Sequence, residues 1–327
     1  MKFIRCFIIS CLALASVAAV SCKKDKDDEE TKEYLNGTLT IDVPKYLKYG
    51  DVVHIEPTGV YKSDESDTLL YCSWTNPLTR VTDTVRLESD PASKSKAFDF
   101  KVTVDSLASF TITVAVWADG YYARSATANF TIVNSTLGSG SLKGYDFLEG
   151  VSEINDSRDG QDYYYNTVGG KDWLIQNLAW NGAGVAYDES EAMSYIFGRY
   201  YTWDEAVTAC PSGWHLPSSA DFSAIAGDGA AGNLMVDATF NGDTMWEFWP
   251  AVKITNSSRF SAIPVGYIKV DGDQKTFIGL NNYAMFWTSD EKSGDMAVAR
   301  YIYVDKPTLF AGEFGKSSIR ASVRCVR

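Results

Sequence analysis

Apolar and polar residues alternate along the first part of the chain. The alternating apolar positions are Leu39, Ile41 and Val43; Val53 and Ile55; Leu70, Cys72 and Trp74; Phe98, Phe100, Val102 and Val104; Phe110, Ile112, Val114 and Val116; and Ala126, Ala128, Phe130 and Ile132. Turn-forming residues such as Asn76-Pro77 and Asp119-Gly120 separate these runs. About seven short strands with turns between them predict an antiparallel β-sandwich, which we place at residues 35–134.

The pattern changes after residue 134. Residues 135–144 are small, polar and glycine-rich, which is typical of a linker between domains. Asp159-Gly160 and Gly169-Gly170 then predict hairpin turns at either end of a strand.

Two helices are predicted next. Thr202 with Glu205 forms a capping box, and apolar residues follow at helical spacing up to Cys210. Ser218 with Asp221 marks a second helix start. Strands are expected after it at residues 260–263, 267–270, 277–280, 286–288, 297–304 and 322–326. Strands combined with helices predict an α+β domain at residues 145–327, and an α+β fold overall.

The first residues resemble a bacterial lipoprotein signal. Lys2 and Arg5 precede an apolar run of about 14 residues, too short to span a bilayer. Small residues then lead to Cys22. We therefore expect a signal peptide at residues 1–21, lipid on Cys22 and an acidic tether at residues 22–34. An ordinary secretory signal is the alternative. The acidic tether resembles a surface-export signal of Bacteroidetes lipoproteins, although a plain periplasmic spacer would also fit.

Composition limits the partners. The chain has 327 residues, 45% of them hydrophobic, and a formal net charge of −12. A surface this acidic repels phosphate backbones, so we expect no nucleic-acid partner. The expected partners are a membrane, through the lipid, and a glycan or a surface protein. Three cysteines remain after Cys22, namely Cys72, Cys210 and Cys325, which allows one disulfide and one free thiol.

The sequence shows no motif for catalysis. The two histidines, His54 and His215, fall in different predicted domains, so they form no pair for a metal or a proton relay. Acidic groups at residues 188–191 and 271–273 suit solvated turns better than calcium sites. We expect no cofactor, no metal and no enzymatic activity.

Seven motifs in the second half of the chain identify a family. They are Asp159-Gly160-Gln161, residues 165–168, residues 173–178, residues 198–203, residues 210–217, residues 286–289 and residues 322–327. In this order they resemble the Fibrobacter succinogenes major paralogous domain of Bacteroidetes and Fibrobacteres surface proteins, over about residues 155–327. The first half ends in residues 109–117 and 122–133, which resemble the last strands of a PKD or immunoglobulin-like repeat.

A looser resemblance is to C-type-lectin-like domains. It rests on Trp203, Ala206 and Cys210, then on Leu216-Pro217, and on a final strand containing Cys325. This resemblance implies a Cys210–Cys325 disulfide. The triplets that bind calcium and sugar in such lectins are missing, so their calcium-dependent sugar binding is not implied.

The lectin-like resemblance also implies where a ligand would bind. Variable loops lie between the second helix and the closing strands, here about residues 227–282. Trp246 and Trp249 lie in this segment and Tyr283 just after it, and aromatic rings of this kind stack on sugars or anchor proteins. Core filling is the alternative for the two tryptophans.

These patterns lead to one leading hypothesis and two alternatives. The leading hypothesis is an outer-membrane lipoprotein, exposed on the cell surface, that acts as a non-enzymatic binding or adhesion module. A structural, tip or accessory subunit of a fimbria is the first alternative. An enzyme of unrecognised type is the second.

Overall fold

The N-terminal part of the protein is built around one five-stranded sheet. The computed structural model describes residues 32–62, 70–87, 99–144, 148, 150–226, 231–247 and 249–327. The order of the sheet is β3 (Tyr46–Leu47), β11 (Arg124–Ile132), β9 (Ala108–Trp117), β6 (Leu70–Thr75) and β7 (Thr82–Leu87). Three short strand pairs accompany it: β1 (Glu33–Tyr34) with β10 (Tyr121–Tyr122), β2 (Asn36–Thr40) with β5 (Thr58–Tyr61), and β4 (Val52–His54) with β8 (Asp99–Lys101).

The alternating apolar residues of the sequence form the buried face of these sheets. Ile112, Val114 and Val116 of β9 are buried, while the residues between them are more exposed. They pack in one core with Trp74 of β6 and with Phe100 of β8. Because the short pairs and the large sheet share this core, the two form opposing layers. The large sheet is not purely antiparallel, since β3 runs parallel to β11.

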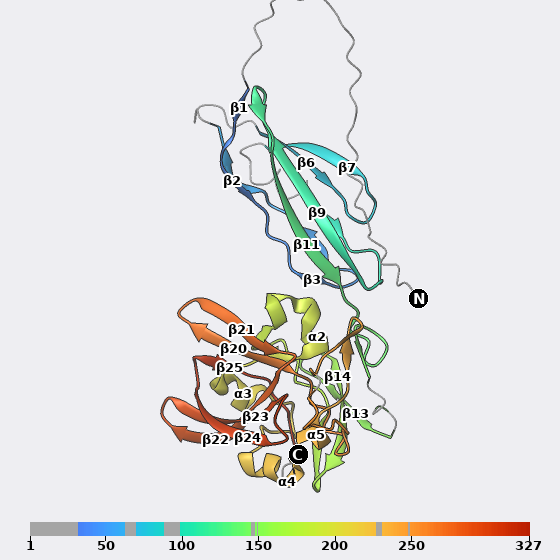
Figure 1. Ribbon diagram of the computed structural model, residues 1–327, viewed down its shortest axis with the longest axis vertical. Coiled ribbons are helices and arrows are strands. Elements are labelled where there is room, and N and C mark those ends of the chain that lie inside the picture. The colour runs from blue at the N-terminus through green and yellow to red at the C-terminus, as the bar shows by residue number, and fades with distance from the viewer. Residues whose placement is uncertain are drawn as a thin grey trace, which may run out of the picture.

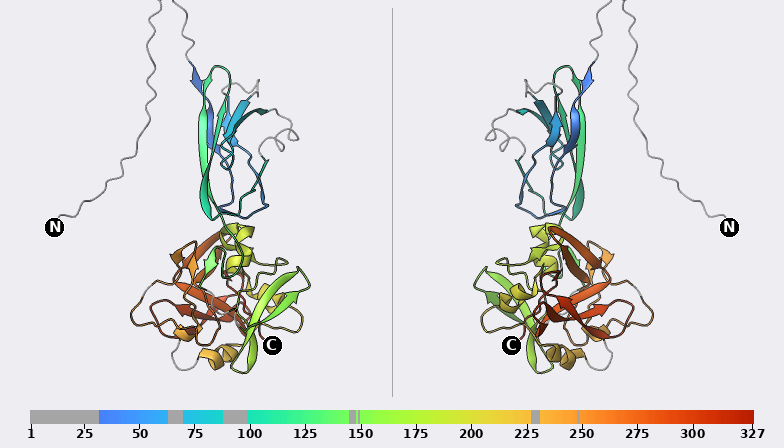
Figure 2. Two further views of the ribbon diagram at one scale, coloured as in Figure 1. Left: turned by 90° about the vertical axis from the view of Figure 1, so that its right-hand side faces the viewer. Right: turned by 90° about the vertical axis from the view of Figure 1, so that its left-hand side faces the viewer.

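The two parts of the molecule touch at β3. The sandwich stands end-on against the C-terminal part, with β11 leading into it (Figures 1 and 2). The backbone N–H of Tyr46 donates to the Ser190 hydroxyl at 3.2 Å. The Tyr46 ring lies 6.1 Å from the rings of both Tyr187 and Phe240. Lys45 pairs with Asp188 at 3.1 Å.

Part of the predicted linker belongs to the C-terminal part. Leu142 is buried there, and β12 (Leu142–Lys143) pairs with β18 (Thr239–Phe240), which in turn pairs with β19 (Asp243–Thr244). The domain boundaries stay predictions, but the hydrophobic clusters divide close to them. One cluster is centred on residues 35–132, and three others gather buried residues from 133 to 326.

A six-stranded sheet forms the rest of this C-terminal part. Its order is β21 (Gln274–Leu280), β20 (Val265–Asp271), β22 (Tyr283–Ser293), β23 (Met296–Tyr303) and β24 (Leu309–Gly315), with β25 (Ile319–Arg320) on β20. Two smaller sheets join it: β13 (Ser152–Asp156), β14 (Gln161–Val168) and β15 (Lys171–Leu174), and the pair β16 (Val185–Ala186) and β17 (Arg199–Tyr200).

The predicted α+β fold class is wrong. Strand takes 47% and helix 11% of the described residues, so the fold is mostly β. Both predicted helices form, as α3 (Trp203–Ala209) and α4 (Ser219–Ala226), and α3 carries the predicted capping box of Thr202 and Glu205. They are only seven and eight residues long, however. The other described helices are α2 (Ser194–Phe197) and α5 (Ala231–Leu234), with single 3₁₀ turns at η2 (Tyr187–Glu189) and η3 (Glu191–Met193).

Two of the predicted late strands do not form, and one strand was missed. Residues 322–326 make only isolated bridges, at Ser322 and Val326. Residues 260–263 form no strand; they make an isolated bridge at Ala262, although Phe260 and Ala262 are fully buried as their apolar pattern suggested. Strand β24 was missed because glycines interrupt its apolar pattern at Gly312 and Gly315.

Candidate functional site

A groove lies in the segment that the sequence indicated for ligand contact. It has a volume of about 570 Å³ and is lined mainly by residues between 235 and 254, with Val304 from the chain just after β23. Gly232 of α5 holds this segment in place. A Cβ at Gly232 would lie 2.1 Å from the Lys253 carbonyl oxygen, so only glycine admits this approach. The Gly232 carbonyl then accepts the backbone N–H of Thr255 at 2.9 Å.

The two predicted tryptophans occupy different places in the groove. Trp246 is 1% exposed, and its indole N–H donates to the Ala262 carbonyl at 3.2 Å. It packs in a core with Phe260, which supports the core-filling alternative for this residue. Trp249 is 42% exposed at the rim, where its carbonyl accepts the backbone N–H of Val252 at 3.0 Å. Only Trp249 therefore presents its ring to solvent.

Polar side chains complete the groove. Asp237, Thr244, Glu247 and Lys253 line it and are exposed. An apolar ring beside hydroxyl, carboxylate and ammonium groups can stack on one face of a ligand and exchange hydrogen bonds with its edges. None of these polar residues was predicted from the sequence to contact a ligand, because nothing in the pattern marks an exposed loop residue as part of a groove.

Neither histidine reaches this groove. His54 pairs with Asp99 on the sandwich. His215 exchanges two backbone hydrogen bonds of 2.9 Å with Val326. Within the described residues, no three His, Cys, Asp or Glu side chains gather as they would around a metal ion.

Tyr283 lies outside the groove, in a cluster that we call the tyrosine face. It contains Tyr267, Tyr283, Tyr301 and Tyr303, all half-buried on β20, β22 and β23. The Tyr283 ring is 4.5 Å from Tyr303, 6.1 Å from Tyr267 and 6.3 Å from Tyr301. Burial and the neighbouring Tyr303 raise the pKa of Tyr283. The alternation of Tyr301 and Tyr303 was a signal that the sequence offered and that we did not use.

Glycines make room for these rings. A Cβ at Gly279 would lie 2.8 Å from the Tyr283 ring, and one at Gly312 would lie 2.7 Å from the ring of Phe314, a neighbour of Tyr301. Tyr303 ends β23, and Val304, which lines the groove, follows it directly.

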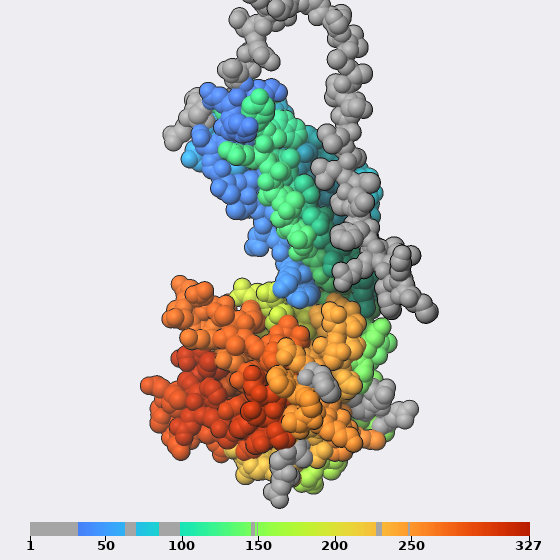
Figure 3. All heavy atoms as spheres, in the orientation of Figure 1, coloured from blue at the N-terminus to red at the C-terminus, as the bar shows by residue number. Residues whose placement is uncertain are grey.

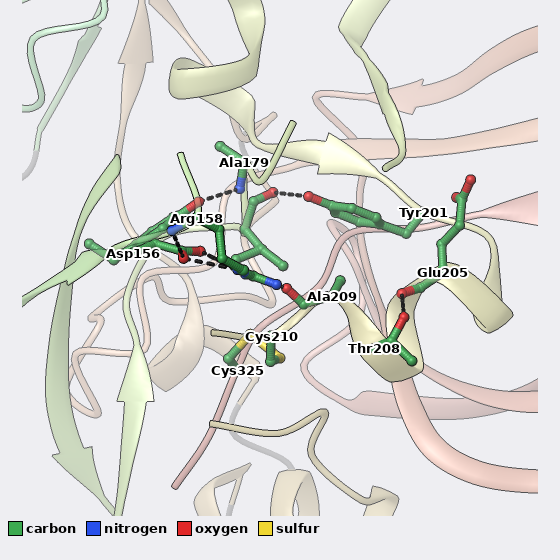
Figure 4. The surroundings of a disulfide bond; sticks show 11 residues. Asp156, Arg158, Ala179, Tyr201, Glu205, Thr208, Ala209, Cys210 and Cys325 are labelled. Atoms are coloured by element: carbon green, nitrogen blue, oxygen red, sulfur yellow. Dashed lines mark hydrogen bonds and ion pairs between the residues drawn. A yellow bond between two sulfur atoms is a disulfide. The ribbon is translucent and has the colours of Figure 1, made fainter. Parts of the chain in front are cut away.

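The predicted disulfide is present in the C-terminal part. Cys210, after α3, bonds to Cys325, with their Cα atoms 5.7 Å apart (Figure 4). Beside it, Arg158 donates to the Ala209 carbonyl at 2.7 Å and pairs with Asp156, whose side chain is only 1% exposed. Burial opposes ionisation of Asp156, but the hydrogen bonds and charge of Arg158 lower its pKa.

Two predictions about attachment are not addressed by the described structure. The signal peptide at residues 1–21 and the lipidation site at Cys22 lie outside the described residues. None of the helices in the described ranges has the length and apolar character needed to cross a bilayer.

Residues 167–327 match the family model of the Fibrobacter succinogenes major domain. No curated protein matches the chain.

Proposed function

We propose that residues 167–327, which form a Fibrobacter succinogenes major domain, are a carbohydrate-binding head carried on a lipid-anchored protein. The family description carries no activity, so the proposal rests on the groove. The observation behind it is the exposed indole of Trp249 beside the polar side chains of Asp237, Glu247 and Lys253.

The groove suits a sugar better than a wholly apolar ligand. A pyranose has one apolar face of C–H groups that packs on an indole, and hydroxyl groups at its edge that need donors and acceptors. Trp249 supplies the ring, while Asp237 and Glu247 supply acceptors and Lys253 a donor. A volume of about 570 Å³ is in the range of small-molecule sites and fits one or two sugar units.

Glycan-array binding tests this proposal. The soluble chain from residue 23 onward should bind a defined set of glycans, and Trp249→Ala should weaken binding about 5- to 150-fold, as typical interface anchors do. Tyr49→Ala is the matched control, because Tyr49 is also exposed, at 61%, but lies on the sandwich. Binding that survives Trp249→Ala would contradict the groove, and a chain that binds no glycan would contradict the function.

We propose binding without turnover. Asp237 and Glu247 are exposed carboxylates on the rim of an open groove, and no histidine accompanies them. A bound oligosaccharide incubated with the protein should therefore be recovered intact by mass spectrometry. Recovery of shortened products that disappear in Asp237→Asn or Glu247→Gln would establish the enzyme alternative instead.

The lipid anchor is the second part of the proposal and is tested separately. Cells expressing the chain should incorporate labelled palmitate into it, and Cys22→Ala should abolish the label and release the protein from membranes. Protease treatment of intact cells should remove the protein if it faces outward. A Cys22→Ala protein that still takes up palmitate would contradict the anchor.

One observation favours the alternative role in a surface assembly. The tyrosine face runs toward β24, which is at the edge of the sheet and pairs only with β23. Exposed sheet edges and half-buried tyrosines are both common where protein chains join. Chemical cross-linking on cells should then join β24 to another chain; purified protein that stays monomeric and uncross-linked would weigh against this role.

A further inference from the structure

Three exposed tyrosines gather at the free end of the sandwich. Tyr34 in β1 is 62% exposed, Tyr61 in β5 is 59% exposed, and Tyr122 in β10 is 47% exposed. Strand β1 lies at the end of the sandwich that points away from the C-terminal part (Figure 1). We call these three residues the tyrosine tip. It lies far from both the groove and the tyrosine face (Figure 3).

Backbone pairing places the three tyrosines on neighbouring strands. Tyr34 is paired with Tyr122, and their ring centroids are 4.9 Å apart. Tyr61 is paired with Asn36, two residues after Tyr34. Gly37 has a φ of +80°, and a Cβ there would lie 2.0 Å from the Gly59 carbonyl oxygen, so this glycine allows β2 and β5 to approach closely at the tip. The tip is therefore set by the register of two strand pairs.

One arginine is fixed within the tip. The Arg124 guanidinium lies 5.2 Å from the Tyr34 ring, and its Nε donates to the Leu35 carbonyl at 3.0 Å. Glu33 and Asp119 are close in sequence to Tyr34 and Tyr122, so this end is not strongly basic. Any surface that it contacts must be recognised mainly through the aromatic rings.

The chain enters the described structure at this same end. Lys32 is the first described residue, directly before β1. Residues 23–32 can reach at most about 35 Å when fully extended. A lipid on Cys22 would therefore keep the tip within that distance of the bilayer, whereas the groove is in the C-terminal part, on the other side of the sandwich.

We infer that the tyrosine tip rests on the lipid headgroups of the membrane that holds the anchor, an inference that depends on the proposed lipidation of Cys22. Tyrosine suits this layer because its ring packs against acyl chains and glycerol while its hydroxyl reaches water. Arg124 is placed to donate to a lipid phosphate. The contact orients the sandwich so that the head points away from the membrane.

Hydrogen exchange on vesicles tests the inference. The lipidated full chain is bound to vesicles of phosphatidylethanolamine and phosphatidylglycerol, and amide exchange is compared with that of full-chain Cys22→Ala in solution. Residues 33–37, 58–61 and 121–124 should exchange about fivefold or more slowly on vesicles, because contact with lipid suppresses local opening. The slowing should change little between low and high salt, since rings rather than charges make the contact.

Two variants and one control sharpen the test. Tyr34→Ser/Tyr61→Ser/Tyr122→Ser should remove the slowing while leaving exchange in solution unchanged, and Tyr61→Ser alone should reduce it if the triple variant is unstable. Tyr49→Ser, with a similar exposed fraction at another position, should leave it intact. Flotation with vesicles without any slowing at the tip overturns the inference and leaves the anchor standing. A wild-type chain that takes no lipid and does not float overturns the anchor and this inference with it, leaving glycan binding to its own test.

Discussion

At the scale of single residues, Trp246 and Trp249 divide the two roles that the sequence left open. Trp246→Ala should lower the free energy of unfolding by about 3–5 kcal/mol, because it removes a fully buried indole and leaves a cavity. Trp249→Ala should leave the melting temperature nearly unchanged, because its ring is 42% exposed. Thermal melts of the two variants measure the difference. Equal losses of stability would show that both rings are structural and would remove the stacking ring from the groove.

Cys72 is a second residue with a definite expectation. It is fully buried in the sandwich core, and burial raises the pKa of its thiol to about 12. The reactive thiolate is therefore scarce at neutral pH. In the folded chain from residue 23 onward, iodoacetamide at pH 8 should leave Cys72 unlabelled, and full labelling of Cys72 should require denaturant. Rapid labelling under native conditions would mean that this part of the sandwich opens.

At the scale of elements, the disulfide closes a long stretch of chain. Cys210 and Cys325 are 115 residues apart, and chain-entropy estimates give such a bridge about 4–5 kcal/mol, with measured values often lower. Cys210→Ser/Cys325→Ser should therefore lower the denaturant midpoint substantially. Val207→Ser, at an exposed position of α3, breaks no bridge and is the control. A double variant as stable as the parent would mean that packing alone holds these elements.

Two carboxylates make the stability of the C-terminal part depend on pH. Burial opposes ionisation of both Asp156 and Asp221, but Arg158 lowers the pKa of the first, and Lys171 with Ser218 lowers that of the second. A lowered folded-state pKa adds stability that is present above the ordinary value of 3.8 and is lost as pH falls through the folded value.

The melting temperature should therefore fall steeply below about pH 4. Asp156→Asn should melt at a lower temperature than the parent at pH 7. Its melting temperature should fall less on acidification, because the titrating carboxyl group is gone. Asp243→Asn, at an exposed position of β19, serves as the control. A parent profile that stays flat from pH 5 to pH 2 would contradict this account.

Sequence patterns located local elements better than their arrangement. The Thr202–Glu205 capping box marked α3 correctly because both partners lie within one turn. The fold class failed because the described helices are at most eight residues long, and most other described residues form strands or irregular chain. Gly312, which interrupts the pattern of β24, is there for the Phe314 ring, a contact that appears only in three dimensions. For the same reason, the sequence pointed to single aromatic residues but not to the neighbours that surround them. Trp249 and Tyr283 were found as aromatics, but the groove needs Val304, some 50 residues later, and Tyr283 belongs to a separate face.

At the scale of the whole molecule, one tyrosine joins the two parts. Tyr46 packs against Tyr187 and Phe240, and its N–H donates to Ser190. Tyr46→Ala removes the ring contacts and keeps the backbone bond. Calorimetry should then resolve two transitions, or a wider separation between them, because the parts no longer stabilise each other. Val52→Ala, an exposed position on the sandwich, is the control. An unchanged calorimetric profile would show that Tyr46 contributes nothing to coupling.

The chain enters the sandwich at one end and leaves it at the other. This arrangement determines how the sandwich responds to a pulling force. A pull between a membrane anchor before Lys32 and a ligand held in the groove acts lengthwise along β11, whose residues from Arg124 to Ile132 pair with β9 without interruption. Hydrogen bonds between antiparallel strands stand perpendicular to that direction. Under such a pull they would be sheared together rather than unzipped one after another, so β11 would separate from β9 only when many bonds fail at once.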